Sequence, residues 1–313
     1  YARLVDDSLI ESAVTRFAMM RRFGSENQTA PAPSIACILA NCPGKIARCA
    51  TDHDCRSGLM CFNGCKPDDL ACIFQCDSDF ENDIYDDMIK CFFTDNNCMR
   101  LPAGETFDKF EKCRSVDKAT PMTKYLGEPL TDATSSRLLS RGGTDHGYWL
   151  VAQGLSHAYD CFDCQNLWFY QNQSSSDALT YSAIYRIHKS NGLFRWNRAD
   201  YSVNASTFIQ PGRVFLRAPD YGGLVHEEDW RILAVDERSN SPSWIALYYC
   251  GGAPGVMEAY EGSCVLTPDG NLPESSDERA KINAVYEKAG ITLACLPNNT
   301  AAACAGHPSP IFH

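Results

Sequence analysis

The chain has 313 residues, 44% of them hydrophobic and 11% aromatic, which is typical of one large or two ordinary globular domains. Its 28 basic and 39 acidic side chains give a net charge of −11 at pH 7. Proteins that bind a phosphate backbone need basic surfaces, so we expect no nucleic-acid partner. No apolar run approaches the ~20 residues of a membrane-spanning helix. We therefore expect a soluble or peripherally membrane-associated protein.

The first 35 residues differ from the rest of the chain. Residues 1–22 carry apolar side chains at helical spacing, and a stretch rich in Gly, Ser and Pro follows at 24–34. We interpret residues 1–35 as an amphipathic helix and a linker. Such a helix packs on its own chain, lies on a membrane surface or binds a partner protein, and the sequence leaves these alternatives open.

Residues 36–113 form a cysteine-rich domain. Ten of the 17 cysteines lie between residues 37 and 98, and their gaps lack the paired C-x2-C knuckles and histidines of zinc sites. This spacing favours disulfides, so we expect no metal site. So many disulfides indicate an oxidising compartment. We interpret the domain as a helical staple without chemistry of its own.

The spacing of these cysteines predicts how they pair. Cys61 and Cys65 are four residues apart, as are Cys72 and Cys76, so each pair lies on one face of a helix. A proline in the connection turns the two helices antiparallel, which predicts nested bridges. The same nesting upstream and a local loop downstream give the remaining pairs, so the predicted bridges are Cys61–Cys76, Cys65–Cys72, Cys37–Cys55, Cys42–Cys49 and Cys91–Cys98.

After a linker at 114–146, residues 147–270 change to short strands of alternating polarity separated by turn residues. We expect eight strands, near 148–154, 165–171, 179–188, 193–202, 212–218, 229–236, 243–250 and 260–267. Eight antiparallel strands close a barrel that holds one elongated ligand. Residues 271–313 follow as a helix near 276–290 and a tail.

The predicted fold class is therefore mainly β. It is an eight-stranded antiparallel lipocalin-like barrel with a C-terminal helix, preceded by a small disulfide-rich helical module. A first strand that carries Gly147-Tyr148-Trp149 and the closing helix both fit the lipocalin plan.

Several stretches carry a resemblance to a known family. They are the cysteine ladder through 76–82, the Tyr-Asp-Cys-Phe-Asp-Cys-Gln block at 159–165, and the segments 228–233 and 247–249. Over about residues 36–300 the chain resembles the violaxanthin de-epoxidase family, with its de-epoxidase-like and de-epoxidase-related members. The resemblance implies a xanthophyll ligand, the chloroplast thylakoid lumen, ascorbate as co-substrate, and a Cys164–Cys295 bridge between the barrel and its closing helix.

The chain departs from the family pattern at several positions. Glu228 stands where the family has an aspartate implicated in catalysis, and Leu266 stands where it has a tyrosine considered important. Leu167 and Tyr170 replace histidines thought to sense acidity. These departures favour a de-epoxidase-like or de-epoxidase-related relative over an ordinary, acid-switched de-epoxidase.

Opening an epoxide requires a proton on its oxygen, and a carboxylic acid in an apolar pocket has a raised pKa and holds that proton. The candidate catalytic residues are Glu228, Asp160, Asp163, Asp229 and Tyr249. We prefer Asp160 and Glu228, because each lies beside aromatic residues in a family block. The candidate substrate-binding residues are Trp149, Phe162, Gln165, Trp168 and Trp230. The alternative is an exposed strand end for each carboxyl group and core packing for each aromatic ring.

The resemblance implies an enzyme that opens the epoxide of an epoxy-xanthophyll, either reductively with ascorbate or by isomerisation to an allenic product. An alternative is a non-catalytic lumenal protein that binds pigment or attaches to a photosynthetic membrane complex through residues 1–22. An enzyme requires an open barrel with a proton-holding carboxyl inside, whereas a structural protein requires a plugged or pigment-filled barrel. An extracellular lipocalin for another apolar ligand is a third alternative.

Overall fold

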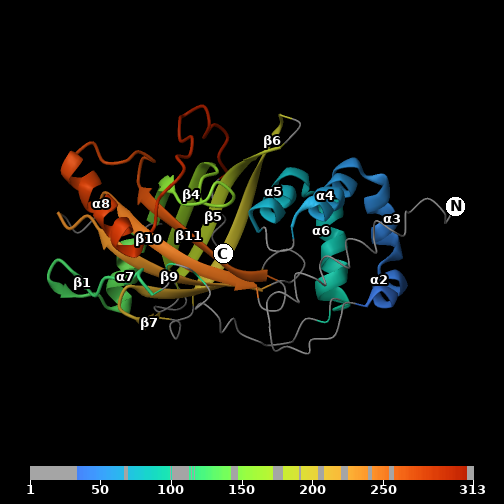
Figure 1. Cartoon of the computed structure of the whole chain (residues 1–313), viewed down its shortest axis with the longest axis horizontal. Coiled ribbons are helices and arrows are strands. Elements are labelled where there is room, and N and C mark those ends of the chain that lie inside the picture. Colours follow the sequence, from blue (N-terminus) through green and yellow to red (C-terminus); the bar gives the residue numbers. More distant parts are fainter. Residues whose placement is uncertain are drawn as a thin grey trace.

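The computed structural model describes residues 34–66, 70–98, 100, 113, 115, 117–141, 147–171, 179–189, 192–203, 208–219, 225–238, 242–253 and 257–308. The helix expected at 1–22 lies outside these residues. Figure 1 shows a helical module beside a curled antiparallel sheet. Within the described part of the chain, no helix has the length and apolar character that crossing a membrane requires.

The helical module consists of short helices that begin at polar caps. Ser34, Asp52 and Asn82 each accept hydrogen bonds from backbone N–H groups at the start of a helix, which satisfies donors that have no partner within that helix. The helices are α2 (Ile35–Asn41), α3 (Pro43–Thr51), α4 (His53–Gly64), α5 (Leu70–Phe80) and α6 (Asp83–Lys90), followed by the π-helical turn η1 (Cys91–Asp95). Their buried sides meet in a core of aliphatic, aromatic and cysteine side chains.

The nested pairing between α4 and α5 is present as predicted, with bridges Cys61–Cys76 and Cys65–Cys72. The three other bridges predicted in the module, Cys37–Cys55, Cys42–Cys49 and Cys91–Cys98, were wrong. The structure has Cys37–Cys98, Cys42–Cys91 and Cys49–Cys55 instead. The reason is that η1 returns beside α2, so nesting occurs between these two elements, while Cys49 and Cys55 close the corner between α3 and α4.

The sheet is antiparallel, and it closes into a ring when β6 pairs with β8 through Ser202 and Arg217. The ring strands are β3 (Gly147–Gly154), β4 (Asp163–Gln171), β5 (Leu179–His188), β6 (Phe194–Val203), β8 (Arg213–Pro219), β9 (Val225–Val235), β10 (Ile245–Ala253) and β11 (Met257–Thr267). A short strand, β7 (Phe208–Gln210), adds to β8 at the edge. The predicted eight-stranded antiparallel barrel is therefore confirmed.

Shorter elements cover the outside and one end of the barrel. They are the hairpin of β1 (Lys124–Tyr125) and β2 (Glu128–Pro129), helix α7 (Asp132–Leu139) and helix α8 (Ser276–Ala289). Helix α8 begins at the cap Ser275 and ends at Gly290, which has a left-handed backbone. The hydroxyl of Tyr286 donates to the carbonyl oxygens of Leu247 and Cys264 at 3.1 and 2.8 Å, so this helix is fixed to β10 and β11.

Three bridges tie distant parts of the barrel together: Cys113–Cys250, Cys161–Cys295 and Cys164–Cys304. The bridge Cys164–Cys295 that the resemblance implied was wrong. Residue 295 pairs by its backbone with Gly154, next to the Cys161 loop, whereas the N–H of Cys164 donates to the carbonyl of Asn298 further along the tail. Among the described cysteines, Cys264 is the free one, and it is buried.

One end of the barrel is filled, and the other faces the module. At the filled end Trp149 is fully buried, and its indole N–H donates to the carbonyl of Leu139 at 2.7 Å. At the other end α5 packs against β5. Arg195 of β6 forms an ion pair with Glu81 just after α5, and Lys189 lies 3.5 Å from Asp54 of α4. The module therefore covers the end of the barrel that is not filled (Figure 1).

Mapping the disulfides tests this arrangement. A protease that cleaves before aspartate separates Cys161 from Cys164 at Asp163, and elastase, which cleaves after alanine, separates Cys295 from Cys304 at residues 301–303. We expect unreduced digests to contain residue 161 linked to 295 and residue 164 linked to 304, identified by mass spectrometry. A peptide that links 164 to 295 would contradict the structure, and the Cys113–Cys250 peptide serves as an internal control.

Candidate active site between the helical module and the barrel

A cavity of about 940 Å³, including solvent at its mouth, lies inside the barrel under α5. Its walls come from β3 to β6, from β9 to β11, from the loop between β3 and β4, and from α5, which contributes Phe74, Asp77 and Ser78. Much of the lining is apolar or aromatic, and two buried carboxyl groups, those of Asp160 and Glu228, project into it. This combination of an apolar wall with a few polar groups is typical of a small-molecule site.

Asp160 lies in the loop after β3, and its side chain is almost fully buried at 2% exposure. One carboxylate oxygen accepts from the hydroxyl of Tyr249, and the other accepts from the backbone N–H groups of Leu155, Ser156 and Ser263 at 3.2, 2.9 and 3.3 Å. Burial raises the pKa of Asp160 to about 7, although these hydrogen bonds act in the opposite direction. The group is therefore a carboxyl that binds and releases a proton near neutral pH.

Glu228 lies on β9 and is 4% exposed. One of its oxygens accepts from the hydroxyl of Tyr260 on β11, and the other accepts from the indole N–H of Trp230 at 2.6 Å. Trp230 in turn stacks on Tyr249, with 5.3 Å between ring centroids and 17° between planes. Because Tyr249 donates to Asp160, the two carboxyl groups are held by one continuous set of aromatic side chains.

Two predicted substrate-binding residues, Phe162 and Gln165, lie on the opposite wall of the cavity. The ring of Phe162 stacks on that of Tyr185 at 4.5 Å between centroids. The amide of Gln165 donates to the carbonyl of Tyr159 at 3.0 Å and accepts from the N–H of Phe162 at 3.2 Å, so it fixes the loop that carries Asp160. Trp230 is the third predicted binding residue found in the cavity.

Four predicted site residues lie outside this cavity. Asp229 follows Glu228 on β9 and points to the other face, where Arg213 and Arg231 pair with it at 2.5 and 2.9 Å. Asp163 pairs with Arg186 and His188 at 2.8 and 2.6 Å. The remaining two are the tryptophans Trp149, at the filled end of the barrel, and Trp168, edge-on to Tyr148.

Sequence analysis missed four groups that the cavity brings together: Tyr260, Tyr159, Cys264 and Phe74. The ring of Phe74 on α5 makes edge contacts with Tyr159 and Tyr260, at 5.6 and 5.9 Å between centroids. Burial raises the pKa of the Cys264 thiol, with further contributions from Asp160 and Glu228. Period-2 alternation places Tyr260 and Cys264 on one face of β11 and is the signal that was available for them. No local signal marks Phe74.

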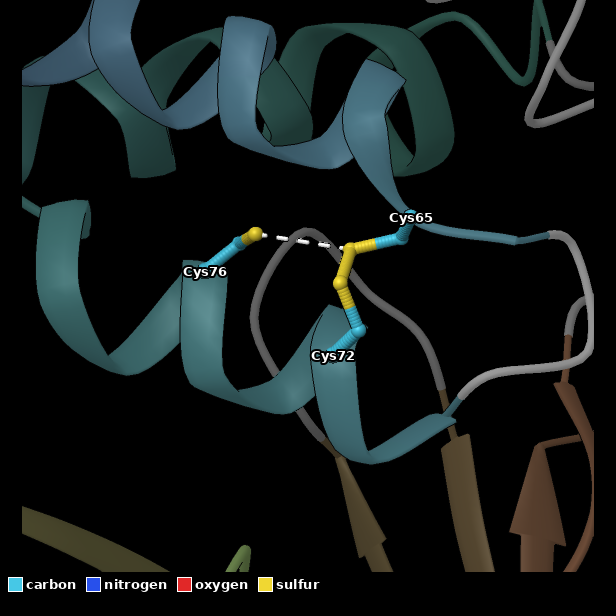
Figure 2. A group of neighbouring side chains, drawn as sticks. All are labelled: Cys65, Cys72 and Cys76. Carbon is cyan, nitrogen blue, oxygen red and sulfur yellow. Dashed lines mark hydrogen bonds between the residues drawn. A yellow bond between two sulfur atoms is a disulfide. The ribbon is translucent and has the colours of Figure 1, made fainter.

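Helix α5 covers the cavity, and its junction with α4 contains a tight cluster of sulfur atoms. The cluster consists of Cys65 at the end of α4 and Cys72 and Cys76 of α5 (Figure 2). Their sulfur atoms lie within 4.8 Å of one another, and Cys65 Sγ is 3.5 Å from Cys76 Sγ. All three belong to the nested disulfides. Metal ions bind cysteine as the thiolate, and a sulfur atom in a disulfide is not a thiolate. In this oxidised form the cluster acts as a covalent anchor for the part of α5 that carries Phe74.

The chain is similar to known proteins over both the helical module and the barrel. The family model described as the VDE lipocalin domain matches residues 34–299. The chain is 24% identical over 245 residues to violaxanthin de-epoxidase, chloroplastic, of Nicotiana tabacum, covering 76% of this chain and 45% of that protein. The chain is 25% identical over 244 residues to violaxanthin de-epoxidase, chloroplastic, of Arabidopsis thaliana, covering 77% of this chain and 47% of that protein. The chain thus spans about half the length of these relatives.

Among solved structures, apocrustacyanin C1 is similar with a TM-score of 0.33 and 12% identity, over 47% of this chain and 72% of that one. Lobster apocrustacyanin A1 gives a TM-score of 0.28 and 11% identity, over 46% and 70%. Structural similarity at this level supports no conclusion about the ligand or the function of this chain. The family model, in contrast, extends over both the helical module and the barrel, and the chain belongs to the VDE lipocalin domain family.

Proposed function

We propose that this protein is an enzyme that opens the epoxide of an epoxy-xanthophyll with the help of an acid, in the cavity under α5. The observation that carries the proposal is Asp160, a carboxyl group in an aromatic cavity whose pKa lies near 7. A carboxyl group with an ordinary pKa is ionised at neutral pH and has no proton to give. Membership of the family, and relatives named violaxanthin de-epoxidase, support the substrate class.

The cavity has a largely apolar and aromatic lining and opens to solvent at its mouth. It suits one ring end group of a xanthophyll and the first part of its polyene, with the remainder leaving through the mouth. Trp230, Phe162 and Tyr185 offer flat apolar surface to such a group. Gln165 supports this wall through its backbone hydrogen bonds and is assigned a positioning role.

In the proposed reaction Asp160 gives its proton to the epoxide oxygen as the C–O bond breaks, which avoids an alkoxide leaving group in an apolar pocket. The hydroxyl of Tyr249 orients the carboxyl group through its hydrogen bond to Asp160. Positive charge that develops on the ring carbon faces the π-surface of Trp230 and the carboxyl group of Glu228. The protein thus supplies the proton, the orientation and the stabilisation of charge.

The opened epoxide has two possible products, and the two reactions differ in the electrons and protons that they consume. In reductive de-epoxidation, ascorbate as co-substrate supplies two electrons and two protons, the oxygen leaves as water, and a double bond forms. In isomerisation, the oxygen stays as a hydroxyl, and Glu228 removes a proton from carbon to give an allene without net reduction. We assign Glu228 as the base in the second case, since it lies in the same cavity as Asp160.

We place the protein in the chloroplast thylakoid lumen. The disulfides suit an oxidising compartment, and the relatives are named chloroplastic. A carboxyl group with a pKa near 7 is protonated in an acidic compartment, so acidity would favour the proposed acid. Attachment to a thylakoid membrane surface or a photosynthetic complex through residues 1–22 stays a proposal.

A non-catalytic pigment-binding or structural subunit is the alternative function. Desolvating a carboxyl group destabilises the fold unless hydrogen bonds or ion pairs compensate the cost. The cavity keeps two such groups beside open space, which favours the enzyme.

Replacing the two cavity carboxyls tests the proposal. We expect Asp160→Asn and Glu228→Gln each to lower turnover of violaxanthin by about 10²–10⁴-fold, the usual contribution of general acid–base catalysis, because each amide keeps the shape but transfers no proton. Turnover is measured by pigment chromatography with and without ascorbate, which also separates the two reaction outcomes. Pigment binding, followed by quenching of tryptophan fluorescence, should change little.

The matched control is Asp163→Asn, three residues from Asp160 but paired outside the cavity with Arg186 and His188. It should leave turnover within about twofold of the parent. Full activity of Asp160→Asn, or no turnover of any epoxy-xanthophyll by the parent protein, would contradict the proposed function.

The pKa of Asp160 also predicts how stability depends on pH. Its value of about 7 in the folded protein lies above the ordinary value of ~3.9, so between these values the folded state holds a proton that the unfolded state has lost. The contribution to the free energy of unfolding is therefore full below about pH 4 and declines towards pH 7, by about 1.4 kcal/mol per pH unit.

Denaturant unfolding between pH 4 and 7 measures this slope. Asp160→Asn should remove it, so the difference in free energy of unfolding between parent and variant changes steadily across that range. Asp163 has a lowered pKa and is not the source of this slope, so Asp163→Asn should retain the decline that Asp160 causes. Parallel curves for Asp160→Asn and the parent would show that Asp160 is ionised in the folded protein at pH 5.

A further inference from the structure

The polar side chains of the cavity meet across strands in two neighbouring rows. In the first row Glu228 of β9 pairs with Gly251 of β10, which pairs with Tyr260 of β11. In the second row Trp230 pairs with Tyr249, which pairs with Gly262. Each row contains one glycine, and side chains of both rows face the barrel interior. The glycines lie where tyrosine side chains lean across the sheet.

At Gly251 a side chain would occupy the space between Glu228 and Tyr260. A Cβ atom there would lie 2.7 Å from Cγ of Glu228 and 2.9 Å from Cζ of Tyr260, closer than carbon atoms approach in proteins. The hydroxyl of Tyr260 reaches the carboxyl of Glu228 over this position. The hydrogen bond therefore requires that β10 carry no side chain at residue 251.

At Gly262 the same constraint applies to Tyr249. A Cβ atom on residue 262 would fall on the phenol ring and hydroxyl of Tyr249. That ring extends from β10 across β11 towards the loop after β3, where its hydroxyl donates to Asp160. Gly262 leaves the opening through which the ring passes.

A positive φ explains neither glycine. The described glycines with positive φ include Gly212, Gly270 and Gly290, and neither Gly251 nor Gly262 is among them. Gly262 lies in regular strand pairing, and Gly251 is the last paired residue before the register shift between residues 251 and 253. Glycine weakens a strand, because it packs no side chain and has a large conformational entropy when unfolded. Two such residues in adjacent strands at a carboxyl-bearing cavity point to a need for space.

We propose that Gly251 and Gly262 are positioning residues of the cavity, each providing the opening through which a tyrosine hydroxyl reaches a buried carboxyl group. Gly251 serves the pair Tyr260 and Glu228, and Gly262 serves the pair Tyr249 and Asp160. The inference rests on the proposed function, since it assigns these openings to the site that handles protons. The placement of the tyrosines is measurable without turnover.

Three variants test the assignment at Gly262: Gly262→Ala, Tyr249→Leu and the double variant. The hydrogen bond from Tyr249 lowers the pKa of Asp160, so its loss should raise that pKa. We expect a shift of the same direction and size in all three variants, because the methyl group and the loss of the phenol remove the same bond. The carboxyl pKa is read by carbon-13 NMR of aspartate-labelled protein, with the Asp160 signal assigned by its absence in Asp160→Asn.

Turnover of violaxanthin provides the second readout. Gly262→Ala and Tyr249→Leu should each lower it at least tenfold, and the double variant should be no worse than Tyr249→Leu alone. Gly44→Ala is the control, because a Cβ atom at Gly44 meets nothing within 4 Å. It should change neither the Asp160 pKa nor turnover.

The outcomes separate this inference from the proposed function. If the parent protein turns over no epoxide but the pKa shifts coincide, the proposed function fails and the positioning role stands. If Gly262→Ala leaves the Asp160 pKa unchanged, or if the shifts of the single variants add in the double variant, the positioning role is overturned. If Gly262→Ala does not fold, recovery of folding in the double variant supports the role, and failure of the double variant to fold overturns it.

Discussion

The structure depends on keeping two buried carboxyl groups inside a barrel cavity that is lined largely by apolar and aromatic side chains. Removing a carboxyl group from water costs several kcal/mol unless hydrogen bonds replace the lost hydration. Asp160 receives one hydroxyl and three backbone N–H donors, and Glu228 receives a hydroxyl and an indole N–H. These donors come from β9, β10, β11 and the loop after β3, so the register of those elements and the chemistry of the cavity are fixed together.

The disulfides reinforce the same region. Cys161 directly follows Asp160, and Cys250 lies between Tyr249 and Gly251 on the opposite face of β10. Cys72 and Cys76 flank Phe74 on the helix that covers the cavity. Each bridge thus holds the backbone next to a side chain that lines the site. The tyrosine side chains that reach the two carboxyl groups pass over glycines in the neighbouring strand, where there is little spare room. Small shifts of the backbone would therefore break these hydrogen bonds, and the disulfides limit such shifts.

Sequence patterns predicted the barrel well, because period-2 alternation and turn residues are local properties that survive into the folded chain. They also predicted the nested bridges Cys61–Cys76 and Cys65–Cys72, whose geometry depends on two consecutive helices. They failed for Cys37 and Cys42, because their pairing depends on which elements lie side by side. The partner of Cys42 is 49 residues away at the start of η1, and the partner of Cys37 is 61 residues away, just after η1.

The site was predictable to a similar extent. Asp160, Glu228 and Tyr249 were found through their sequence blocks, but Glu228 and Asp229 are neighbours with like charge, and only the orientation of β9 tells the inward residue from the outward one. Tyr260 and the two strand glycines gain meaning only from the register between strands, which no local pattern specifies. Phe74 belongs to another part of the chain altogether.

The helical module consequently does more than staple the chain. The raised pKa of Asp160 arises first from burial, and burial at this end of the barrel depends on what covers the mouth. Phe74 of α5 lies edge-on against Tyr159 and Tyr260, which places an apolar ring between the solvent and the aromatic wall. An uncovered barrel would admit water to Asp160 and return the pKa of its carboxyl group towards the ordinary value. The module and the barrel therefore make one site. The disulfides fix α5 over the cavity, and the two glycines leave room for the tyrosines that donate to Asp160 and Glu228.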